Sequence, residues 1–581
     1  MDITGLLDNK RAMRTFFYSS IFSAAFIGAM ASLPNGFVWD DMHIVTNPVL
    51  IDKKGTFYGY FFDKGLYYRP FIKLSFALDW SMWRMSPLGY HLHNILIHVA
   101  NSVLVFVVAG RLMEDGDMPA FLAALVFALH PAHTEPIAWI SGRTDLLVTF
   151  FFLLSFLGFL VYRWEDDIKG IVVCAMFYLF AMFSKENGAA MIAVALAYGL
   201  LTRMPLRRLL ISSVILSAVV ILYFILRQWS GLTDVIMRPG TQGAYLSSAF
   251  SLKTFLYTLV YGSGYYIEKL FLPLNLNLLP AIPEGIGYAL IFCAALGGTI
   301  YCFIRCAPSQ TFLILWIFLT MLPSLSIMFS QVAAPLGERY LYLPSVGFSI
   351  LIVGLLAKAL NRRFLIGFVI LISIGFFVLS NERFSVWYSD LTLWGNTARK
   401  SPSSAVAHTN YGIAMMQEKD ITGAEKELFT ALRIPDNSKE QTALILNSLS
   451  NVEIFRKNYK KASKYLIEAI DKDPNCTAAY NNLGYVYMQM SAAPGVDEKG
   501  RVESLKTAIS YFDKAAVLAP WLSQTKFNLG ICYFSLDDYD KAEKYFYDTV
   551  DADPLSELGK KAAMLLTSAK MRKTAGSYLR R

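Results

Sequence analysis

The stretch TDLLVTFFFLLSFLGFLVYR, residues 144–163, decides the class of the fold because it is almost wholly apolar. A helix of about 20 apolar residues crosses the roughly 30 Å hydrocarbon core of a bilayer, so this stretch predicts a transmembrane helix. Hydrophobic residues make up 55% of the chain and charged residues only 17%. Soluble domains carry about 25% charged residues, so the composition excludes a chain made of soluble domains alone.

Similar apolar segments lie on both sides of this stretch. Together with it, the candidate spans are residues 15–33, 91–111, 118–130, 144–163, 170–184, 187–202, 208–227, 252–272, 285–304, 310–330, 345–360 and 364–381. The first follows Lys10, Arg11 and Arg14, as the apolar region of a signal peptide would. No clear small-residue cleavage site follows it, so we expect a retained helix.

The basic residues of the short loops predict how the spans are oriented. Cytoplasmic loops are rich in Lys and Arg, and the tight connections at Arg111, Arg305 and Arg362 are of this kind. With these loops and the N-terminus inside, the spans alternate only if residues 252–272 do not cross. Charged residues and glycines interrupt that segment, so we expect it to be interfacial or re-entrant. The prediction is 11 crossings, with the C-terminal part outside the cytoplasm.

The last third of the chain has the composition of a soluble domain. Residues 391–581 hold about half of all Lys, Arg, Asp and Glu residues. We therefore expect a membrane domain, residues 1–390, and a soluble domain, residues 391–581. The net charge of +9 is spread about evenly over both parts, so no basic block predicts a nucleic-acid partner. The six cysteines form no CxxC pair and predict neither a zinc site nor a disulfide framework.

The soluble domain contains a repeat. Gly530, Ala542, Phe546 and Pro554 are separated by 12, 4 and 8 residues. These are the small, aromatic and proline positions of the tetratricopeptide repeat, whose period is about 34 residues. Related patterns end at Pro520, at Pro474 and near Ala431. We expect about four repeats whose helix pairs stack into an α-solenoid with a concave groove.

Two adjacent carboxylates follow the first span. Asp40 and Asp41 precede His43, and no Walker A loop, HExxH, GxSxG or strand-helix GxGxxG motif occurs in the chain. The two acids fit a general base with an orienting partner. They also fit oxygen ligands of a metal, a helix N-cap or solvated loop charges.

A second polar run, His130, His133 and Glu135, follows the third span. Two histidines and a carboxylate suggest a metal site. Pro131 and Pro136 break the helical spacing, so we favour a polar pocket or an interfacial loop.

Basic residues also lie at the ends of spans. They are Arg69, Arg143, Lys185 beside Glu186, and Arg339 between Glu338 and Tyr340. A guanidinium group in an aromatic setting suits a phosphate, because it is always charged and donates two parallel hydrogen bonds. The alternatives are snorkelling of Arg339 and Arg69 to lipid headgroups, and self-neutralisation of the Lys185–Glu186 pair.

Taken in order, these motifs resemble those of one family. They are Trp39-Asp40-Asp41, Tyr68-Arg69-Pro70, HPAHTE at 130–135, WISGR at 139–143, SKEN at 184–187 and ERYLYLPS at 338–345. With the repeats that follow, the chain resembles the transmembrane and tetratricopeptide-repeat O-mannosyltransferases and their bacterial relatives, within the GT-C glycosyltransferase superfamily. About four repeats are fewer than in the animal members, which favours a bacterial relative.

The resemblance implies an all-α GT-C membrane bundle that transfers a sugar, with inversion, from a polyprenyl phosphate to Ser or Thr hydroxyls of proteins. Asp40 is expected to act as base and Asp41 to orient the acceptor, with the division between them open because the related motif has Glu second. Arg339 is expected to hold the leaving phosphate, with Arg143 or Lys185 as second candidate. The expected pocket-lining residues are His43, Arg69, His130, His133, Glu135, Glu186, Glu338 and Tyr340.

The partners implied are the polyprenyl-phosphate sugar, an acceptor polypeptide presented by the repeats, and the lipid bilayer. We expect no cofactor, and a divalent metal is open but not favoured. The favoured location is the bacterial inner membrane with periplasmic repeats, and the alternative is the endoplasmic reticulum with lumenal repeats. A lipid or glycan acceptor and a non-catalytic scaffold are the rival functions.

Overall fold

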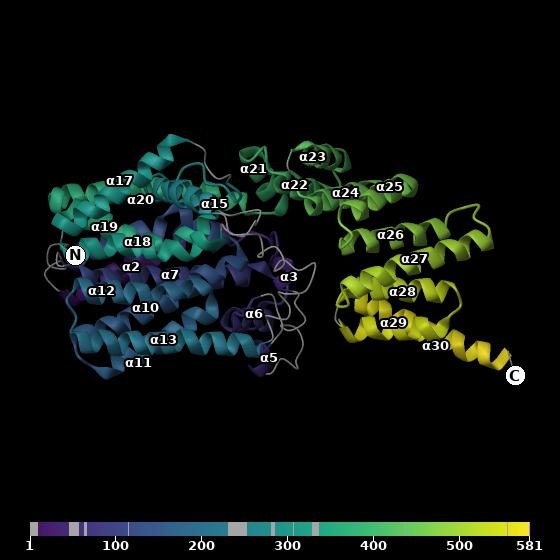
Figure 1. Cartoon of the computed structure of the whole chain (residues 1–581), viewed down its shortest axis with the longest axis horizontal. Helices are drawn as coiled ribbons and strands as arrows, with labels where there is room; N and C mark the ends of the chain where they lie inside the picture. Colours follow the sequence, from purple (N-terminus) through teal and green to yellow (C-terminus); the bar gives the residue numbers. More distant parts are fainter. Residues whose placement is uncertain are drawn as a thin grey trace. The chain divides into compact units, whose positions relative to one another are not determined.

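The computed structural model is helical throughout the residues that it describes, with no strand among them (Figure 1). These residues are 10–45, 57–62, 67–113, 116–230, 252–280, 285–305, 307–327, 336–435, 437–552, 554 and 556–579. The chain divides into two compact units, Met1–Lys400 and Ser401–Arg581. The charge distribution suggested residue 390 instead, because helix α21 (Asp390–Lys400) has a soluble composition although it belongs to the first unit.

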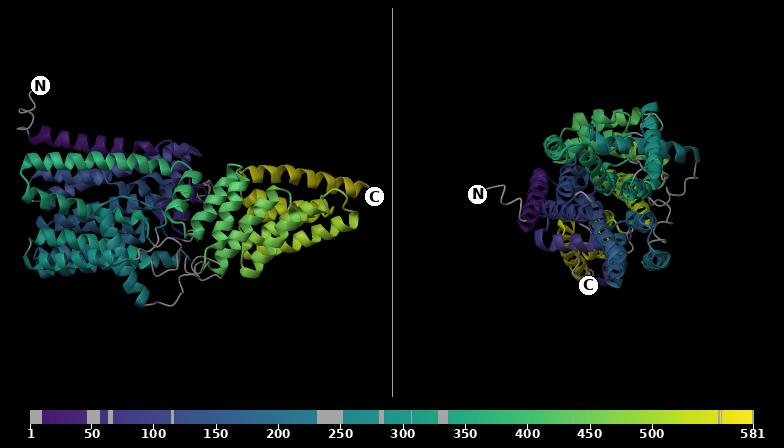
Figure 2. Two further views of the ribbon diagram at one scale, coloured as in Figure 1. Left: turned by 90° about the horizontal axis from the view of Figure 1, so that it is seen from above. Right: turned by 90° about the vertical axis from the view of Figure 1, so that its left-hand side faces the viewer.

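The long helices of the first unit run side by side as a bundle (Figures 1 and 2). They are α2 (Lys10–Ala29), α7 (Pro87–Leu112), α8 (Asp117–Leu129), α10 (Arg143–Trp164), α11 (Ile168–Ser184), α12 (Ala190–Leu201), α13 (Leu206–Trp229), α17 (Ile286–Arg305), α18 (Pro308–Ile327), α19 (Pro344–Ala359) and α20 (Arg362–Val386). Short elements join them: η1 (Met30–Ser32), α3 (Asp41–Val45), α5 (Phe57–Phe62), α6 (Pro70–Trp83), η2 (Pro131–His133), α9 (Thr134–Ala138), η3 (Ile140–Gly142), η4 (Glu186–Ala189), α15 (Leu252–Tyr257), η6 (Thr258–Gly262), α16 (Ser263–Phe271) and η7 (Glu338–Leu341).

Six helices in the described part of the chain are long and apolar enough to cross a membrane, so this is a membrane protein. They span Ala12–Ser32, Pro87–Leu112, Ile140–Trp164, Leu206–Trp229, Ile286–Arg305 and Arg362–Val386. Shorter apolar helices span Asp117–Leu129, Ile168–Ser184, Glu186–Leu201, Pro308–Ser324 and Pro344–Ala359. The segment from α15 to α16 belongs to neither group. The count of 11 crossings stays a prediction.

Glycines allow α10 and α11 to approach each other closely. A Cβ atom on Gly158 would lie 2.7 Å from the backbone nitrogen of Cys174, and one on Gly170 would lie 2.5 Å from that of Tyr162. Both distances are shorter than van der Waals contact, so neither position accepts a larger residue without a backbone shift. Small residues play this part in membrane bundles because lipid offers no hydrophobic drive for helix association.

Within the described residues of the second unit, four consecutive helix pairs are followed by one last helix. The pairs are α22 (Ala405–Gln417) with α23 (Ile421–Arg433), α24 (Lys439–Phe455) with α25 (Tyr459–Lys472), α26 (Thr477–Ser491) with α27 (Glu498–Leu518), and α28 (Ser523–Ser535) with α29 (Tyr539–Ala552). The last helix is α30 (Glu557–Leu579). Phe546 is fully buried, and a Cβ atom on Gly530 would lie 2.6 Å from its ring. The pairing of the small residue with the aromatic one is as the repeat pattern predicts.

Candidate active site

The polar residues singled out in the sequence gather at one end of the bundle of the first unit. Hydrogen bonds and ion pairs there join residues that follow α2, α8 and α11, and Arg383 near the end of α20, to residues of η3, of η7 and of the first turns of α7 and α10. These contacts therefore bring together residues that are far apart in the sequence. The prediction that the charged residues of the membrane domain gather at helix ends therefore has a structural counterpart.

The two adjacent acids have different surroundings. Asp41 is fully buried, and its carboxylate accepts hydrogen bonds from the backbone of Val38 (3.1 Å), the backbone of Ser141 (3.0 Å) and the hydroxyl of Ser141 (2.7 Å). Asp40 is partly exposed, and its Oδ1 accepts a 3.2 Å hydrogen bond from the indole Nε1 of Trp139. Of the two acids, only Asp40 is partly exposed.

Burial raises the pKa of both carboxyl groups. The pKa of Asp41 rises to about 7, because the cost of burial exceeds the stabilisation of the anion by Ser141 and Val38. Burial also raises the pKa of Asp40, against the hydrogen bonds from Ser141 and Trp139. A carboxylate whose pKa is raised is a better proton acceptor than an ordinary one, as a general base requires.

Tryptophans surround Asp40. The rings of Trp39 and Trp139 stack with centroids 4.8 Å apart, and Trp394 of α21 meets Trp39 edge to face at 5.9 Å. Trp39 has φ +58°, in the left-handed region that costs a residue other than glycine roughly 1–2 kcal/mol. Its backbone N–H donates a 2.7 Å hydrogen bond to Asp390.

Arg339 lies over the same aromatic group. Its guanidinium carbon is 5.4 Å from the Trp139 ring centroid and 4.7 Å from that of Tyr340. Nη1 pairs with the buried Glu135 at 2.5 Å, and Nη2 donates to the Tyr340 hydroxyl at 3.3 Å. Glu135 thus binds one side of the guanidinium strongly and leaves Nη2 with a weak neutral partner. That second side is the one available to an anion.

Lys185 approaches the other predicted cation. Its Nζ lies 5.0 Å from the Tyr340 ring centroid and pairs with Asp145 at 2.5 Å. Arg339 and Lys185 therefore both lie against Tyr340, although they are far apart in sequence. Each of these two cations is also paired with a carboxylate, Lys185 with Asp145 and Arg339 with Glu135.

Arg69 and Glu186 form a third ion pair, with Nη2 of Arg69 2.7 Å from Oε2 of Glu186. The Arg69 guanidinium also lies 4.4 Å from the Tyr67 ring centroid. The Lys185–Glu186 pair, which was the alternative interpretation, is not formed. Lys185 pairs with Asp145 and Glu186 with Arg69.

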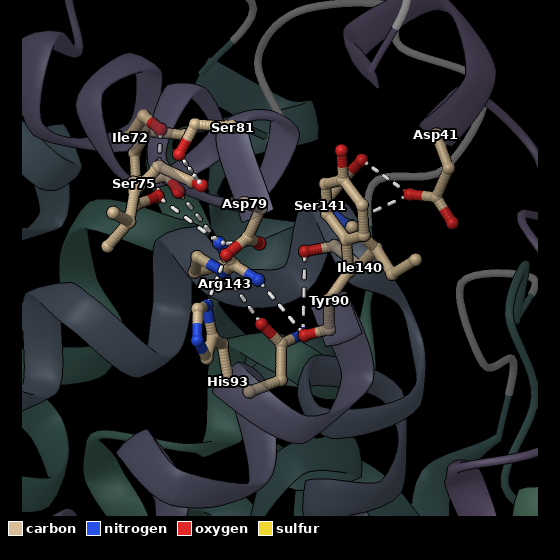
Figure 3. A network of polar contacts seen from close by, with 12 residues as sticks. Asp41, Ile72, Ser75, Asp79, Ser81, Tyr90, His93, Ile140, Ser141 and Arg143 are labelled. Atoms are coloured by element: carbon tan, nitrogen blue, oxygen red, sulfur yellow. Dashed lines mark hydrogen bonds and ion pairs between the residues drawn. The ribbon is translucent and has the colours of Figure 1, made fainter. Parts of the chain in front are cut away.

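Arg143 has a structural position. It is 1% exposed, pairs with the buried Asp79 at 2.5 Å, and donates to Asn94 (2.8 Å) and to the backbone oxygen of Tyr90 (3.0 Å) (Figure 3). His93 contacts the same Asp79 carboxylate. With its donors occupied inside the bundle, Arg143 is not in a position to bind a donor phosphate.

His130 and His133 are also buried within the protein. His130 Nε2 contacts the backbone oxygen of Leu270 at 3.0 Å, and His133 Nε2 contacts the Ser345 hydroxyl at 2.8 Å. Burial lowers the pKa of His133 well below its usual range, so its ring is neutral at neutral pH. No group of three or more metal-ligating side chains occurs among the described residues.

Glu338, the first residue of η7, contacts two other segments of the protein. It is fully buried, accepts a hydrogen bond from the backbone of Asn277, and pairs with Arg383 of α20 at 3.4 Å. Burial raises its pKa to about 7. The side chain of His43, another predicted pocket residue, lies outside the described part of the structure.

Three residues at this site were not predicted as members of it. Trp139 and Ser141 were interpreted only as parts of the WISGR motif. In the structure, Trp139 donates a hydrogen bond to Asp40 and Ser141 donates one to Asp41. Arg143 of the same motif is paired inside the bundle. Asp390 was assigned to the boundary of the soluble domain. The sequence carries no signal for it, since its contact with Trp39 depends on the path of all the helices between them.

The comparisons with known proteins agree with the motifs. A tetratricopeptide-repeat family model matches residues 523–554, the fourth helix pair. A protein O-mannosyl-transferase of Caenorhabditis elegans is 28% identical over 72% of this chain and 63% of its own length. The protein O-mannosyl-transferase TMTC3 of Mus musculus is 24% identical over 73% of this chain and 46% of its own length. The chain is a homologue of proteins named O-mannosyl-transferases.

The likeness is partial in length. The protein O-mannosyl-transferase Tmtc1 of Drosophila melanogaster is 33% identical, but over 28% of this chain and 20% of its own length. The chain thus spans less than two thirds of these three relatives. Among solved structures, YrrB, described as a TPR protein with an unusual peptide-binding site, is 20% identical over 30% of this chain and 81% of its own, with a TM-score of 0.23.

Proposed function

We propose that the protein is a membrane glycosyltransferase that moves a sugar from a polyprenyl phosphate to Ser or Thr hydroxyls of proteins on the non-cytoplasmic face. One observation carries the proposal. The indole of Trp139 donates a hydrogen bond to the carboxylate of Asp40 and lies against the guanidinium of Arg339. A base and an anion-binding cation are thus held on one rigid aromatic group.

The reaction follows from these two groups. Asp40 takes the proton of the acceptor hydroxyl while the oxygen attacks the anomeric carbon from the side opposite the phosphate. The bond between that carbon and the phosphate oxygen breaks, and the configuration inverts. Arg339, with Lys185 beside Tyr340, stabilises the negative charge that collects on the phosphate. Charge stabilisation of this kind is often the largest single contribution to a rate.

Asp41 has the supporting part. Its three hydrogen bonds join the loop at Val38 to Ser141, so it fixes the direction in which Asp40 points. The names of the homologues favour mannose as the sugar and protein as the acceptor. The repeats supply a surface of the kind that binds peptides, so we assign the acceptor polypeptide to them. Transfer needs no cofactor in this scheme, and EDTA should leave it unchanged.

The test uses the purified full-length protein with polyprenyl-phosphate mannose and a Ser/Thr-containing acceptor peptide. The expected product is a peptide heavier by one hexose in the mass spectrum. Sugar appearing in the lipid fraction or on a free glycan instead favours the rival acceptors. If the folded protein transfers sugar to none of these acceptors, the result favours a non-catalytic scaffold. Glycoproteomics of a deletion strain then identifies the natural acceptor and shows whether the membrane is the bacterial inner membrane.

A further inference from the structure

Asp390 ties the end of the membrane bundle to the loop that carries Asp40. Its Oδ1 accepts the backbone N–H of Trp39 at 2.7 Å, and the side chain of Trp394 hydrogen-bonds the same carboxylate. Asp390 is the first residue of α21 and comes just after α20, whereas Trp39 comes just after α2. The contact therefore joins two segments at the same end of the bundle.

Two more hydrogen bonds hold the same two segments together. The backbone N–H of Gly36 donates to the oxygen of Tyr388 at 3.0 Å, and the side-chain amide of Asn35 donates to the oxygen of Phe384 at 3.2 Å. The loop before Asp40 is thus supported by the end of α20 and by the connection that follows it. The bond to Asp390 is the last of the three and the one nearest Asp40.

The conformation of Trp39 makes this bond important for the position of Asp40. With φ at +58°, Trp39 turns the chain so that Asp40 faces Trp139 while the Trp39 ring stacks on the same indole. A non-glycine residue keeps a left-handed conformation only where its surroundings fix it. Asp390 fixes it by accepting the N–H that this conformation presents, and by holding Trp394 against the Trp39 ring.

We propose that Asp390 is a positioning residue that holds the backbone of Trp39 in its left-handed conformation and so keeps Asp40 on Trp139. This inference rests on the proposed function, in which Asp40 is the base. It also gives α21 a part in the reaction. The helix that leads directly into the repeats at Ser401 begins with the residue that supports the base.

The test compares Asp390→Ala with Asp390→Asn in the transfer assay. Alanine removes the acceptor, so kcat should fall up to about a hundredfold, the scale for a catalytic group displaced by roughly 1 Å. The KM values for donor and acceptor should stay unchanged, because neither binding group is touched. Asparagine keeps an acceptor oxygen for the Trp39 N–H and should retain most of the activity. Asp167→Ala is the matched control: it removes an aspartate that caps α11 at the other end of α10 and α11, and should leave kcat unchanged.

Three outcomes overturn the inference: a wild-type kcat in Asp390→Ala, a loss in Asp390→Asn as large as that in Asp390→Ala, or a rise in KM in place of a fall in kcat. If Asp390→Ala is not recovered folded, Asp390→Ser takes its place, because its shorter side chain withdraws the acceptor from Trp39. The kcat loss is then expected in the serine variant.

A spectroscopic measurement separates this inference from the proposed function. The stacked rings of Trp39 and Trp139 should give an exciton couplet in the circular dichroism spectrum, assigned by its loss in Trp139→Phe. Asp390→Ala should lose this couplet and Asp390→Asn should keep it. If the wild-type protein transfers no sugar, the proposed function fails, and the couplet alone decides about Asp390. An intact couplet in Asp390→Ala contradicts the positioning role.

Discussion

Two arginines at the same end of the bundle, Arg143 and Arg339, have opposite surroundings. Arg143 is 1% exposed and pairs with Asp79, which is itself fully buried, while its other nitrogens donate to Asn94 and Tyr90. Arg339 is 11% exposed, and only its Nη1 has a carboxylate partner. Its Nη2 contacts a phenol, and its face lies on aromatic rings. Arg143 has the surroundings of a residue in a structural ion pair, whereas Arg339 has those expected of an anion-binding residue.

The comparison shows that the position of an arginine in the sequence does not tell whether its charge stabilises the fold or binds an anion. Both arginines lie at the beginning of a helical element, next to aromatic residues. What separates them is whether the hydrogen-bond donors are satisfied inside the protein. A satisfied guanidinium stabilises the fold, and one with a weakly satisfied edge is free to take up a phosphate.

The largest effect is expected from Arg143→Met. This change leaves Asp79 buried opposite no guanidinium, and breaking a buried pair from one side costs about 3–5 kcal/mol. Denaturant unfolding of the purified protein should show a loss of this size. The matched variant Arg339→Met also leaves a buried carboxylate, Glu135, without its guanidinium. It should lose less stability, because Glu135 keeps the backbone N–H of residue 339 (3.1 Å) and the lost side chain is partly exposed. Equal losses of unfolding free energy in the two variants would contradict the distinction between a structural and an anion-binding arginine.

The next effect is on the rate in Arg339→Met. Removing one preorganised donor to a developing negative charge costs roughly 10²–10³ in kcat. The steady-state assay with saturating donor should show this loss when the rate is expressed per folded molecule. A variant with a normal kcat but a weaker donor affinity would mean that Arg339 binds the ground state and the transition state equally.

Much of this arrangement was predictable from the sequence. The rest was not predictable, and the reason is physical. Helix ends, apolar spans and the Gly530–Phe546 packing of the repeats follow from local pattern, so they were predicted. The pairing of Lys185 with Asp145 and of Arg143 with Asp79 depends on which helices are neighbours. From the sequence, Lys185 with Glu186 was an alternative and Arg143 was a second candidate for the phosphate, because partners distant in the chain are not visible in a local pattern. The residues Asp40, Asp41 and Arg339 stay predictions as members of the reaction.

A smaller effect is expected from Ser141→Ala on the pH dependence. The Ser141 hydroxyl stabilises the anionic forms of Asp41 and Asp40, so its loss raises both pKa values further. The acid limb of kcat/KM should therefore move to higher pH, by about one unit for each 1.4 kcal/mol of lost hydrogen bonding. If the acid limb of the kcat/KM profile stays at the same pH, neither Asp40 nor Asp41 is the group whose titration produces it.

The same pKa shift sets the sign of a stability change. Asp41 binds its proton more tightly folded than unfolded, because its pKa rises from 3.8 to about 7. It therefore adds stability at low pH that is lost as the pH rises through that interval. Asp41→Asn should flatten this part of the stability profile, which denaturant unfolding between these pH values measures.

The smallest effect is expected from Tyr340→Phe. The ring against Arg339 and Lys185 remains, and only the 3.3 Å hydrogen bond from Nη2 of Arg339 is lost. This hydrogen bond is long and its acceptor is uncharged, so its loss should cost about 1 kcal/mol and change kcat less than about tenfold. A fall as large as in Arg339→Met would show that the hydroxyl itself contacts the substrate.

The most direct test of the account is the kcat of Asp40→Asn at saturating donor and acceptor, beside the wild type and Asp167→Asn. Asparagine keeps the hydrogen bond from Trp139 but takes no proton from a hydroxyl. The account predicts a fall of about 10²–10⁴-fold, the usual contribution of a general base, with an unchanged unfolding midpoint. Wild-type turnover by a folded Asp40→Asn protein would contradict the assignment of Asp40 as the base and, with it, the site described around Trp139.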